Sequence, residues 1–486
     1  MQLARSPATL LRAALQGGRA GAYLNILIVG SGIRIFGLAS QFLVLIMLGR
    51  LLSKDAFGDL MTAFGFYRVA AVALGIGGSL VLLYHVSRQS NDVELEVRLH
   101  RYSAVLGAVV SACIAVIGII AAQPIADALG KPNLAGWLRQ LAPFAVFNTL
   151  LVVATGALEG RSRVSESIAL GEVAPNTVRL VLLPLLGWLH LSEGYVAHVL
   201  TVSVLVPWLW AAQRLWDPSI SGFRRWTSWD YSYCGKFVAA TLFANQLGAV
   251  DILVAGALFP SAAVADYVVA SRIAALFAFF QLAILKRFAP RAGALIQVAD
   301  FASLRREVEF CRRLMIGCGA FTIAGLLLTA PFLLPLFGNY GSAQSFIIWL
   351  AIPPFVQSFF DTSDRLLIMA GQPNIPLAVT GCSFLVLITF PFFAAPWLGV
   401  ASIPVAMIAS TLLFKPMIAG RVQKMFNIRT VHPVDAAVIA TGTLALAGNA
   451  AGGSAGGTIV ACSVIAAIGI YYAASASKGA GARLME

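Results

Sequence analysis

The sequence has few charged residues for its length. Only 11% of its 486 residues are Asp, Glu, Lys or Arg, whereas a soluble globular domain has about 25%. In contrast, 59% are hydrophobic, and apolar runs near the ~20 residues needed to cross a ~30 Å hydrocarbon core recur from about residue 24 to the C-terminus. This balance excludes an ordinary soluble enzyme and indicates a polytopic membrane protein.

The sequence also lacks the motifs of common enzyme and metal sites. It contains neither G-x-S-x-G nor a Walker A run, so hydrolytic and ATP-driven mechanisms have no support. The six cysteines show no C-x-x-C spacing, and the five histidines lie at or near span ends without a metal-ligand spacing. We therefore expect no disulfide framework, no metal site, no cofactor and no enzymatic activity.

The apolar segments predict an all-α polytopic membrane protein with about 14 transmembrane helices. We place these spans at residues 24–48, 57–86, 103–122, 138–158, 169–190, 195–213, 237–258, 264–285, 314–337, 345–369, 377–397, 399–420, 434–450 and 456–475. The first is too long for the hydrophobic region of a signal peptide, so we expect it to be retained. The basic N-terminal segment 1–22 is either an amphipathic helix on the membrane surface or a basic tail.

Lys and Arg residues divide unevenly between the two sides of the membrane. The predicted spans place 24 of the 34 on the side that holds both termini, and four on the other. By the positive-inside rule, both termini are then cytoplasmic. This asymmetry explains most of the net charge of +13, so a nucleic-acid partner is not needed.

An internal repeat predicts two lobes of six spans each. The segment Leu51–Asp59 resembles Leu258–Asp266, 207 residues later, and further Pro and Gly pairs recur at similar offsets. Because six is an even number, both lobes enter from the same side and are related by an axis along the membrane normal. Chance matches in so biased a composition are the alternative. The expected order is a first lobe at 23–213, a cytoplasmic linker at 214–236, a second lobe at 237–420, a linker at 421–433, two appended helices at 434–475 and a tail at 476–486.

The joint between the first two spans carries a family resemblance. The run Gly49-Arg50-Leu51-Leu52-Ser53-Lys54-Asp55-Ala56-Phe57-Gly58, followed by a span containing Gly75, Gly77 and Gly78, resembles the polysaccharide transporter, or O-antigen flippase, branch of the multidrug/oligosaccharidyl-lipid/polysaccharide (MOP) exporter superfamily. The architecture of six plus six plus two spans extends this resemblance over nearly the whole chain.

The resemblance implies alternating access of two lobes around a central cavity in the bacterial inner membrane. The substrate would be a polyprenyl-pyrophosphate-linked oligosaccharide, an O-antigen or exopolysaccharide repeat unit, moved by coupling to a proton or sodium gradient. Expected partners are this substrate, membrane lipids and a polysaccharide polymerase or co-polymerase of the same pathway, with the transporter itself a monomer.

Cations inside the predicted spans are the first candidates for substrate recognition. An Arg or Lys at the centre of a lone span costs ~2.5–3.5 kcal/mol, yet six occur: Arg34, Arg68, Arg179, Arg272, Arg365 and Lys415. Guanidinium pairs bidentately with phosphate oxygens and keeps its charge. We expect Arg34, Arg68 and Arg272, joined by Arg179, to hold the pyrophosphate or acidic sugars. Gln41, Asn245 and Gln246 are candidates for sugar hydroxyls, although interhelical hydrogen bonds explain them equally well.

Acidic residues inside the spans are candidates for ion coupling. Asp251 lies near the predicted depth of Arg272, and the two either exchange a proton or form a fixed salt bridge. Glu172 lies seven residues before Arg179, so the two share a helix face and can contact the same neighbour. Glu172 then serves either ion coupling or a structural interaction with Arg179. Asp59 and Asp266 occupy matching repeat positions and read as helix caps.

A third group of charges lies in the inner half of the tenth span. Asp361 and Arg365 are spaced i, i+4, as in a local ion pair or a cytoplasmic gate. Lys415 lies close enough to the interface to extend its ammonium toward water.

Three other functions share parts of this sequence pattern. A lipid II flippase would share the superfamily, the two extra spans and a basic cavity. A membrane polysaccharide polymerase or ligase acts on the same lipid-linked sugars, but every predicted outer loop is short. A cation-drug antiporter would need a carboxylate in the cavity of the first lobe, whereas the first span contains Arg34 and no acidic residue.

Overall fold

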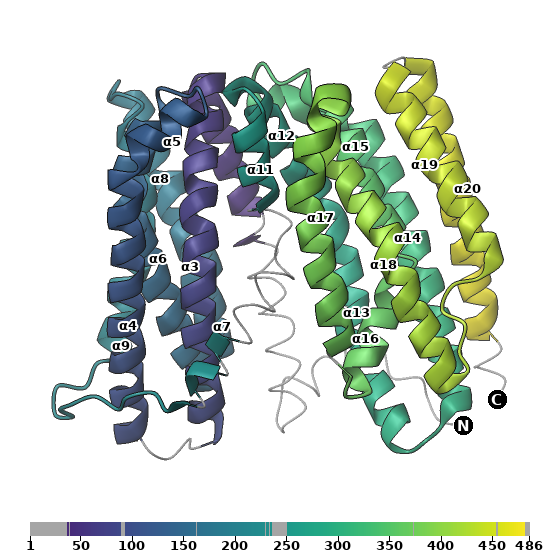
Figure 1. Ribbon diagram of the computed structural model, residues 1–486, viewed down its shortest axis with the longest axis horizontal. Helices are drawn as coiled ribbons and strands as arrows, with labels where there is room; N and C mark the ends of the chain where they lie inside the picture. The colour runs from purple at the N-terminus through teal and green to yellow at the C-terminus, as the bar shows by residue number, and fades with distance from the viewer. Residues whose placement is uncertain are drawn as a thin grey trace, which may run out of the picture. The chain divides into compact units, whose positions relative to one another are not determined.

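The computed structural model describes residues 36–37, 39–88, 93–161, 163–228, 230–232, 234–235, 250–372, 374–452 and 455–481. Within this part of the chain the regular structure is helical throughout (Figure 1). The first helix is described as Ala39–Leu51. The others are α3 Lys54–Arg88, α4 Val93–Ile120, α5 Ala122–Ala128, α6 Leu134–Gly160, α7 Val164–Ile168, the π-helical η1 Ala169–Val173, α8 Ala174–Trp188, α9 Tyr195–Leu215, α11 Val250–Leu258, α12 Ser261–Ala274, α13 Leu276–Gln297, α14 Phe301–Phe337, α15 Ala343–Gln357, α16 Asp361–Met369, α17 Asn374–Leu398, η2 Gly399–Ala401, α18 Ser402–Phe426, α19 Pro433–Gly452 and α20 Ala455–Gly481.

The chain divides into two compact units. Unit 1 comprises residues 1–53 and 63–242, and unit 2 comprises residues 54–62 and 243–486. The first turns of α3 therefore pack within unit 2, while the rest of this helix packs within unit 1. The appended helices α19 and α20 belong to unit 2.

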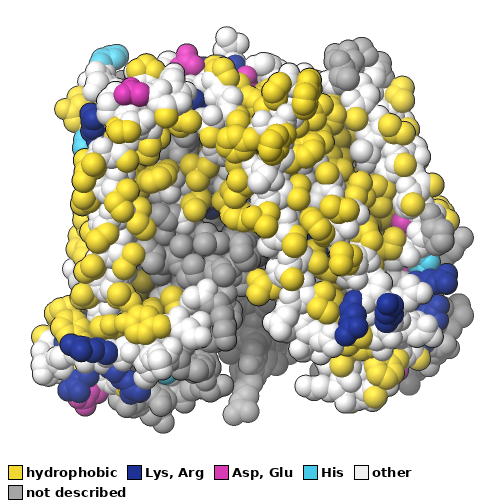
Figure 2. Space-filling view, viewed as in Figure 1, with side chains coloured by type: hydrophobic (Ala, Val, Ile, Leu, Met, Phe, Trp, Pro, Cys, Tyr) yellow, Lys and Arg dark blue, Asp and Glu magenta, His cyan; other side chains and the backbone are white. Residues whose placement is uncertain are grey.

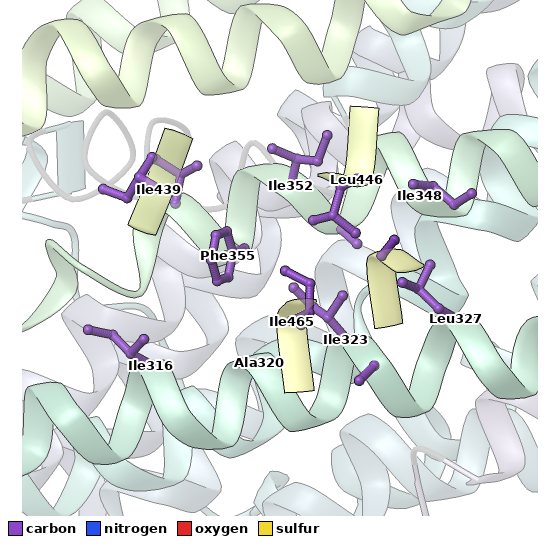
Figure 3. Close-up of a cluster of buried hydrophobic side chains, with 14 of the residues drawn as sticks. Ile316, Ala320, Ile323, Leu327, Ile348, Ile352, Phe355, Ile439, Leu446 and Ile465 are labelled. Carbon is purple, nitrogen blue, oxygen red and sulfur yellow. The ribbon is translucent and has the colours of Figure 1, made fainter. Parts of the chain in front are cut away.

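Each unit has its own apolar core. In unit 1, residues of α3, α4, α6 and α9 meet around Leu82, Leu99 and Val153. In unit 2, α14, α15, α19 and α20 meet in a cluster of buried aliphatic side chains around Phe355 (Figure 3). A second cluster joins α13, α14, α16 and α18 around Phe288. The appended helices are thus part of the core of unit 2.

The helices are long and apolar, as a membrane protein requires. Among the described residues, seven helical stretches are long and apolar enough to cross a membrane. The bent pair of helices α15 and α16 would be an eighth if the two form one span. Hydrophobic side chains cover much of the visible helix surface, and charged ones gather toward the helix ends (Figure 2). The all-α polytopic fold is confirmed. The expected number of 14 spans is not.

Two expected spans are interrupted. The tenth is broken into α15 and α16, which bend by 43° after the sequence Pro353-Pro354. Proline lacks the amide hydrogen that a continuous helix needs. The fifth contains the π-turn η1 immediately before Pro175, because the helix widens where the proline ring excludes the ordinary hydrogen bond.

Candidate functional site

Arg179 lies on α8 in unit 1 among neutral hydrogen-bond partners. Its Nε donates to Ser203 Oγ on α9 at 2.8 Å, and Nη1 donates to Asn176 Oδ1 at 3.2 Å. No carboxylate forms a salt bridge with Arg179 in the described part of the chain. Two neutral oxygens orient the guanidinium without cancelling its charge, which leaves it suited to an anionic ligand.

Arg68, on α3 of the same unit, lies close enough for its charge to act on Arg179. Two like charges in one apolar region repel each other, and an anion between them would relieve the repulsion. The structure thus brings together two of the four arginines expected to bind the substrate. Gln41, also in unit 1, has an exposed side chain.

Glu172 and Arg179 share Asn176 as a neighbour, as their spacing predicts. Asn176 Nδ2 donates to the main-chain oxygen of Glu172 at 2.8 Å while its Oδ1 accepts from Arg179. The Glu172 carboxylate itself is exposed and forms no ion pair with Arg179 among the described residues. Gly37 lies against Glu172: a Cβ there would be 3.7 Å from Glu172 Cβ.

In unit 2, the buried Asp251 and Tyr267 and the half-buried Arg272 form a cluster between α11 and α12. The Tyr267 hydroxyl donates to Asp251 Oδ2 at 2.9 Å, and the charges of Asp251 and Arg272 interact. Asp251 is buried. The sequence analysis predicted similar membrane depths for Asp251 and Arg272. It did not predict Tyr267, because a tyrosine in an apolar span is normally a packing residue.

The charges of α16 pair differently from the expectation. No salt bridge joins Asp361 and Arg365 in the described structure, although their charges interact, and Arg365 is exposed. A gate formed by these two residues stays a prediction. Lys415 of α18 instead forms a salt bridge with Asp364 and lies 3.9 Å from Asp361. The expectation that Lys415 reaches toward water is therefore wrong: α16 packs against α18 and supplies both carboxylates, which hold the ammonium of Lys415 between the helices.

The two matching turns of the repeat contact each other within unit 2. Lys54 Nζ lies 2.8 Å from Asp266 Oδ1, and Asp59 accepts a hydrogen bond from the Ser261 hydroxyl. Positions 54 and 261 correspond at the repeat offset of 207, as do 59 and 266, so the contact is reciprocal. Asp59 and Asp266 thus bind side chains of the other repeat, and their role at the helix starts stays a prediction. The Ser342 hydroxyl also donates to Asp266.

A buried ionic network joins the appended helices to α14, and the sequence analysis did not predict it. Arg312 Nη1 lies 2.7 Å from Asp435 Oδ2, with side chains only 3% and 2% exposed. Asp435 also accepts from the Tyr472 hydroxyl, at 2.5 Å, and Arg312 pairs with Glu309 at 2.9 Å. Glu309 and Arg312 are three residues apart on α14, but Asp435 and Tyr472 lie on α19 and α20, far from α14 in sequence, so no spacing rule connects them to Arg312.

Some expected site residues lie outside the described part of the chain. They are Arg34, Asn245 and Gln246, together with the basic segment 1–22. Among the described residues there is no group of three or more His, Cys, Asp or Glu placed to hold a metal ion.

Two sequence families match the chain. Residues 47–288 match a family described as "Polysaccharide biosynthesis protein", and residues 238–393 match the family "MatE". No curated protein matches it in sequence. The two family matches together extend over most of the chain.

Solved structures share the fold at low sequence identity. A structure described as "Lipid II flippase MurJ, inward closed conformation" has a TM-score of 0.70 and 11% identity, covering 95% of this chain and 100% of that one. An inward-facing multidrug resistance MATE family transporter of the MOP superfamily has a TM-score of 0.66 and 17% identity, covering 80% and 96%. A MOP superfamily transporter from Pyrococcus furiosus has a TM-score of 0.53 and 16% identity, covering 82% and 95%.

The long apolar helices, the two helical units and the arginines held within them agree with these matches. The chain is a polysaccharide transporter-type member of the multidrug/oligosaccharidyl-lipid/polysaccharide exporter superfamily, and hence a transporter and not an enzyme.

Proposed function

We propose that this protein flips a polyprenyl-pyrophosphate-linked oligosaccharide, an O-antigen or exopolysaccharide repeat unit, across the bacterial inner membrane. Two lobes, residues 23–213 and 237–420, would alternate access to a cavity between them, with both termini in the cytoplasm. The match to a family of polysaccharide biosynthesis proteins supports this substrate class. A polymerase or co-polymerase of the same pathway would receive the flipped unit.

The observation that carries the proposal is the environment of Arg179. A guanidinium in an apolar helix is normally neutralised by a carboxylate, but Arg179 is held by a serine hydroxyl and an asparagine amide with a second arginine nearby. Such a site is stable when a multivalent anion enters, and a pyrophosphate supplies several oxygens to each guanidinium. Arg34, Arg68 and Arg272 would contact the same substrate.

The test is a flipping assay in proteoliposomes with a fluorescent polyprenyl-pyrophosphate oligosaccharide. Arg179→Ala should slow flipping about 10- to 100-fold, because a hydrogen bond to a charged group contributes about 1.5–3 kcal/mol. Arg179→Lys keeps the charge and should retain part of the rate. Arg214→Ala removes a half-exposed cation at the end of α9, 3.9 Å from Glu166, and serves as the control. Wild-type flipping by a properly inserted Arg179→Ala variant would contradict the proposal.

A lipid II flippase is the second candidate, because the lipid II flippase fold covers 95% of this chain. Lipid II also carries a pyrophosphate, so Arg179 does not separate the two functions. Offering both lipids to the same proteoliposomes does. Faster flipping of lipid II than of the oligosaccharide lipid would assign the chain to peptidoglycan synthesis.

For ion coupling we propose Asp251, with Glu172 as a second candidate. Asp251 is buried, accepts a hydrogen bond from Tyr267 and interacts with the charge of Arg272, so proton or sodium binding there would change the charge of the whole cluster. Asp251→Asn should abolish gradient-driven flipping while leaving substrate binding intact. Tyr267→Phe removes one hydrogen bond and should weaken the gradient dependence without abolishing it. An unchanged response to the imposed gradient in Asp251→Asn would exclude this role.

A further inference from the structure

The segment that connects the two units is docked against unit 1. Trp226 is only 8% exposed, lies in the core of unit 1, and its Nε1 donates to Ser103 Oγ at 3.0 Å. Asp230 accepts from His85 Nε2 at 2.7 Å and from the main chain and hydroxyl of Thr227. Burial opposes ionisation of Asp230, but these hydrogen bonds hold its pKa below the ordinary value. The segment is therefore anchored at its C-terminal end.

Arginines of α4 fix the other end of this segment. Arg98 Nε donates to the Ser221 oxygen at 2.9 Å, and Arg101 donates to the main-chain oxygens of Asp217 and Ile220. The Arg101 guanidinium also lies 4.3 Å from the centre of the Trp216 ring, a cation–π contact. Residues 216–228 are thus held against the helices of unit 1 in advance of any partner.

This docked segment presents aromatic and basic side chains outward. Trp216 and Phe223 are 61% and 60% exposed, and Tyr231 is also exposed. Arg224 and Arg225 lie between them and are exposed as well. Neither arginine forms a salt bridge with any described residue. Figure 1 shows the segment as a loop beside the ends of α4 and α9, and Figure 2 shows basic and hydrophobic side chains together at that end of unit 1.

Aromatic rings beside unneutralised arginines at the ends of membrane helices match one kind of partner. Trp and Tyr settle at the level of lipid headgroups, Arg side chains reach phosphate from there, and each basic residue near an anionic lipid surface contributes about 1 kcal/mol. Trp216 directly follows α9, which is long and apolar enough to cross a membrane, so the segment begins where a membrane helix ends.

We propose that Trp216, Phe223, Arg224, Arg225 and Tyr231 form a binding surface for anionic phospholipid headgroups, here called the linker surface. The rings enter the headgroup region of the adjacent leaflet, and the two guanidiniums bind lipid phosphates. The surface therefore fixes unit 1 to that leaflet, separately from the substrate site around Arg179.

The test uses the full-length protein in phosphatidylcholine vesicles with and without phosphatidylglycerol. Spin-labelled phosphatidylglycerol and phosphatidylcholine report how strongly each lipid associates with the protein. The wild type should prefer phosphatidylglycerol, and this preference should fall as salt is raised. Arg224→Gln combined with Arg225→Gln should weaken the preference by about fivefold for each arginine. Arg224→Lys with Arg225→Lys keeps both charges and should retain it.

A matched control removes the same charge elsewhere. Arg305 and Arg306 are exposed near the start of α14 in unit 2, and replacing both with Gln should leave the preference nearly unchanged. The difference in fluorescence between the wild type and Trp216→Phe isolates the emission of Trp216. Brominated lipids should quench this emission if the ring enters the headgroup region.

Three results would overturn the proposal. They are an equal association of the two lipids with the wild type, an equal loss of preference in the linker and control variants, or no quenching of Trp216. A wild type without lipid preference whose linker variant still loses transport would assign the surface to a protein partner instead.

Discussion

Buried charges in this protein differ in what neutralises them, and the difference separates candidate function from structure. Arg179 is held by a hydroxyl and an amide, whereas Arg312 and Lys415 are held by carboxylates. Ion pairs of the second kind are complete without a ligand. The sequence marks Arg179 and Lys415 as costly and passes over Arg312, and only the partners show which of the three is available to bind an anion.

The Arg312–Asp435 pair should be essential for stability. Asp435→Ala leaves a buried guanidinium with only Glu309 as an acidic partner, so we expect a loss of about 3 kcal/mol in the free energy of unfolding. Replacing both residues, Arg312→Met with Asp435→Leu, should cost less because no charge is left unpaired. Glu94→Ala breaks the exposed Glu94–Arg98 pair and should cost under about 1 kcal/mol.

Unfolding in mixed detergent micelles measures these differences. A loss from Asp435→Ala no larger than that from Glu94→Ala would show that the buried pair does not stabilise the appended helices.

Asp300 should make the start of α14 sensitive to acid. It caps the helix by accepting from the Ser303 amide at 3.0 Å, and this main-chain hydrogen bond and a contact with the Ser303 hydroxyl lower its pKa below the ordinary value. A carboxyl whose native pKa is lowered stabilises the fold above its unfolded pKa, and this contribution is lost as the pH falls through the native pKa.

We therefore expect Asp300→Ala to lower the thermal midpoint at neutral pH and to have less effect in acid. Asp300→Asn, which still caps but does not titrate, should unfold with a flatter dependence on pH than the wild type. Equal pH profiles for the three proteins would contradict this role.

At the scale of elements, the repeat predicted which turns correspond but not that they meet. The first turns of α3 pack against α11 and α12 so closely that side chains are excluded at two glycines. A Cβ on Gly58 would lie 1.9 Å from the Ser261 oxygen, and one on Gly256 would lie 2.5 Å from Thr62. The sequence could not show this approach because the contacting residues lie about 200 positions apart.

Gly58→Ala should therefore separate α3 from α12 and destabilise unit 2 by about 1–3 kcal/mol, the usual cost of overpacking. Gly325→Ala is the matched control, because a Cβ there meets nothing within 4 Å and alanine favours the helix by up to about 1 kcal/mol. The thermal midpoints of the two variants should shift in opposite directions. A thermal midpoint for Gly58→Ala equal to that of the wild type would mean that α3 and α12 can move apart without loss of stability.

Element boundaries were predictable only where the chain is uniformly apolar. Spans at 138–158 and 195–213 agree with α6 and α9 within a few residues at each end. The predicted tenth span is instead two helices, and the eighth continues as α13 to Gln297. Hydropathy reports the part of a helix that lies in hydrocarbon, so it misses both polar extensions and internal bends.

At the scale of the whole molecule, the distribution of Lys and Arg predicts the orientation. Both termini should face the cytoplasm, so alkaline phosphatase fused to either end should be inactive and a fluorescent protein fused to either end should be bright. The same enzyme inserted after Lys131, in a loop predicted to face outward, should be active and serves as the positive control. An active fusion at the C-terminus would mean an odd number of spans.

The sequence by itself determined the class of protein, since hydrophobicity, charge content and the spacing of apolar runs are properties of the chain. It also identified the cations that are costly in a membrane, including Arg68, Arg179 and Arg272. Only the tertiary structure decided their surroundings: Ser203 beside Arg179, Tyr267 beside Asp251, Asp364 beside Lys415, and the docking of the linker through Trp226. The physical reason is that hydrogen bonds and ion pairs act over a few ångströms between helices far apart in sequence, so their partners are set by packing.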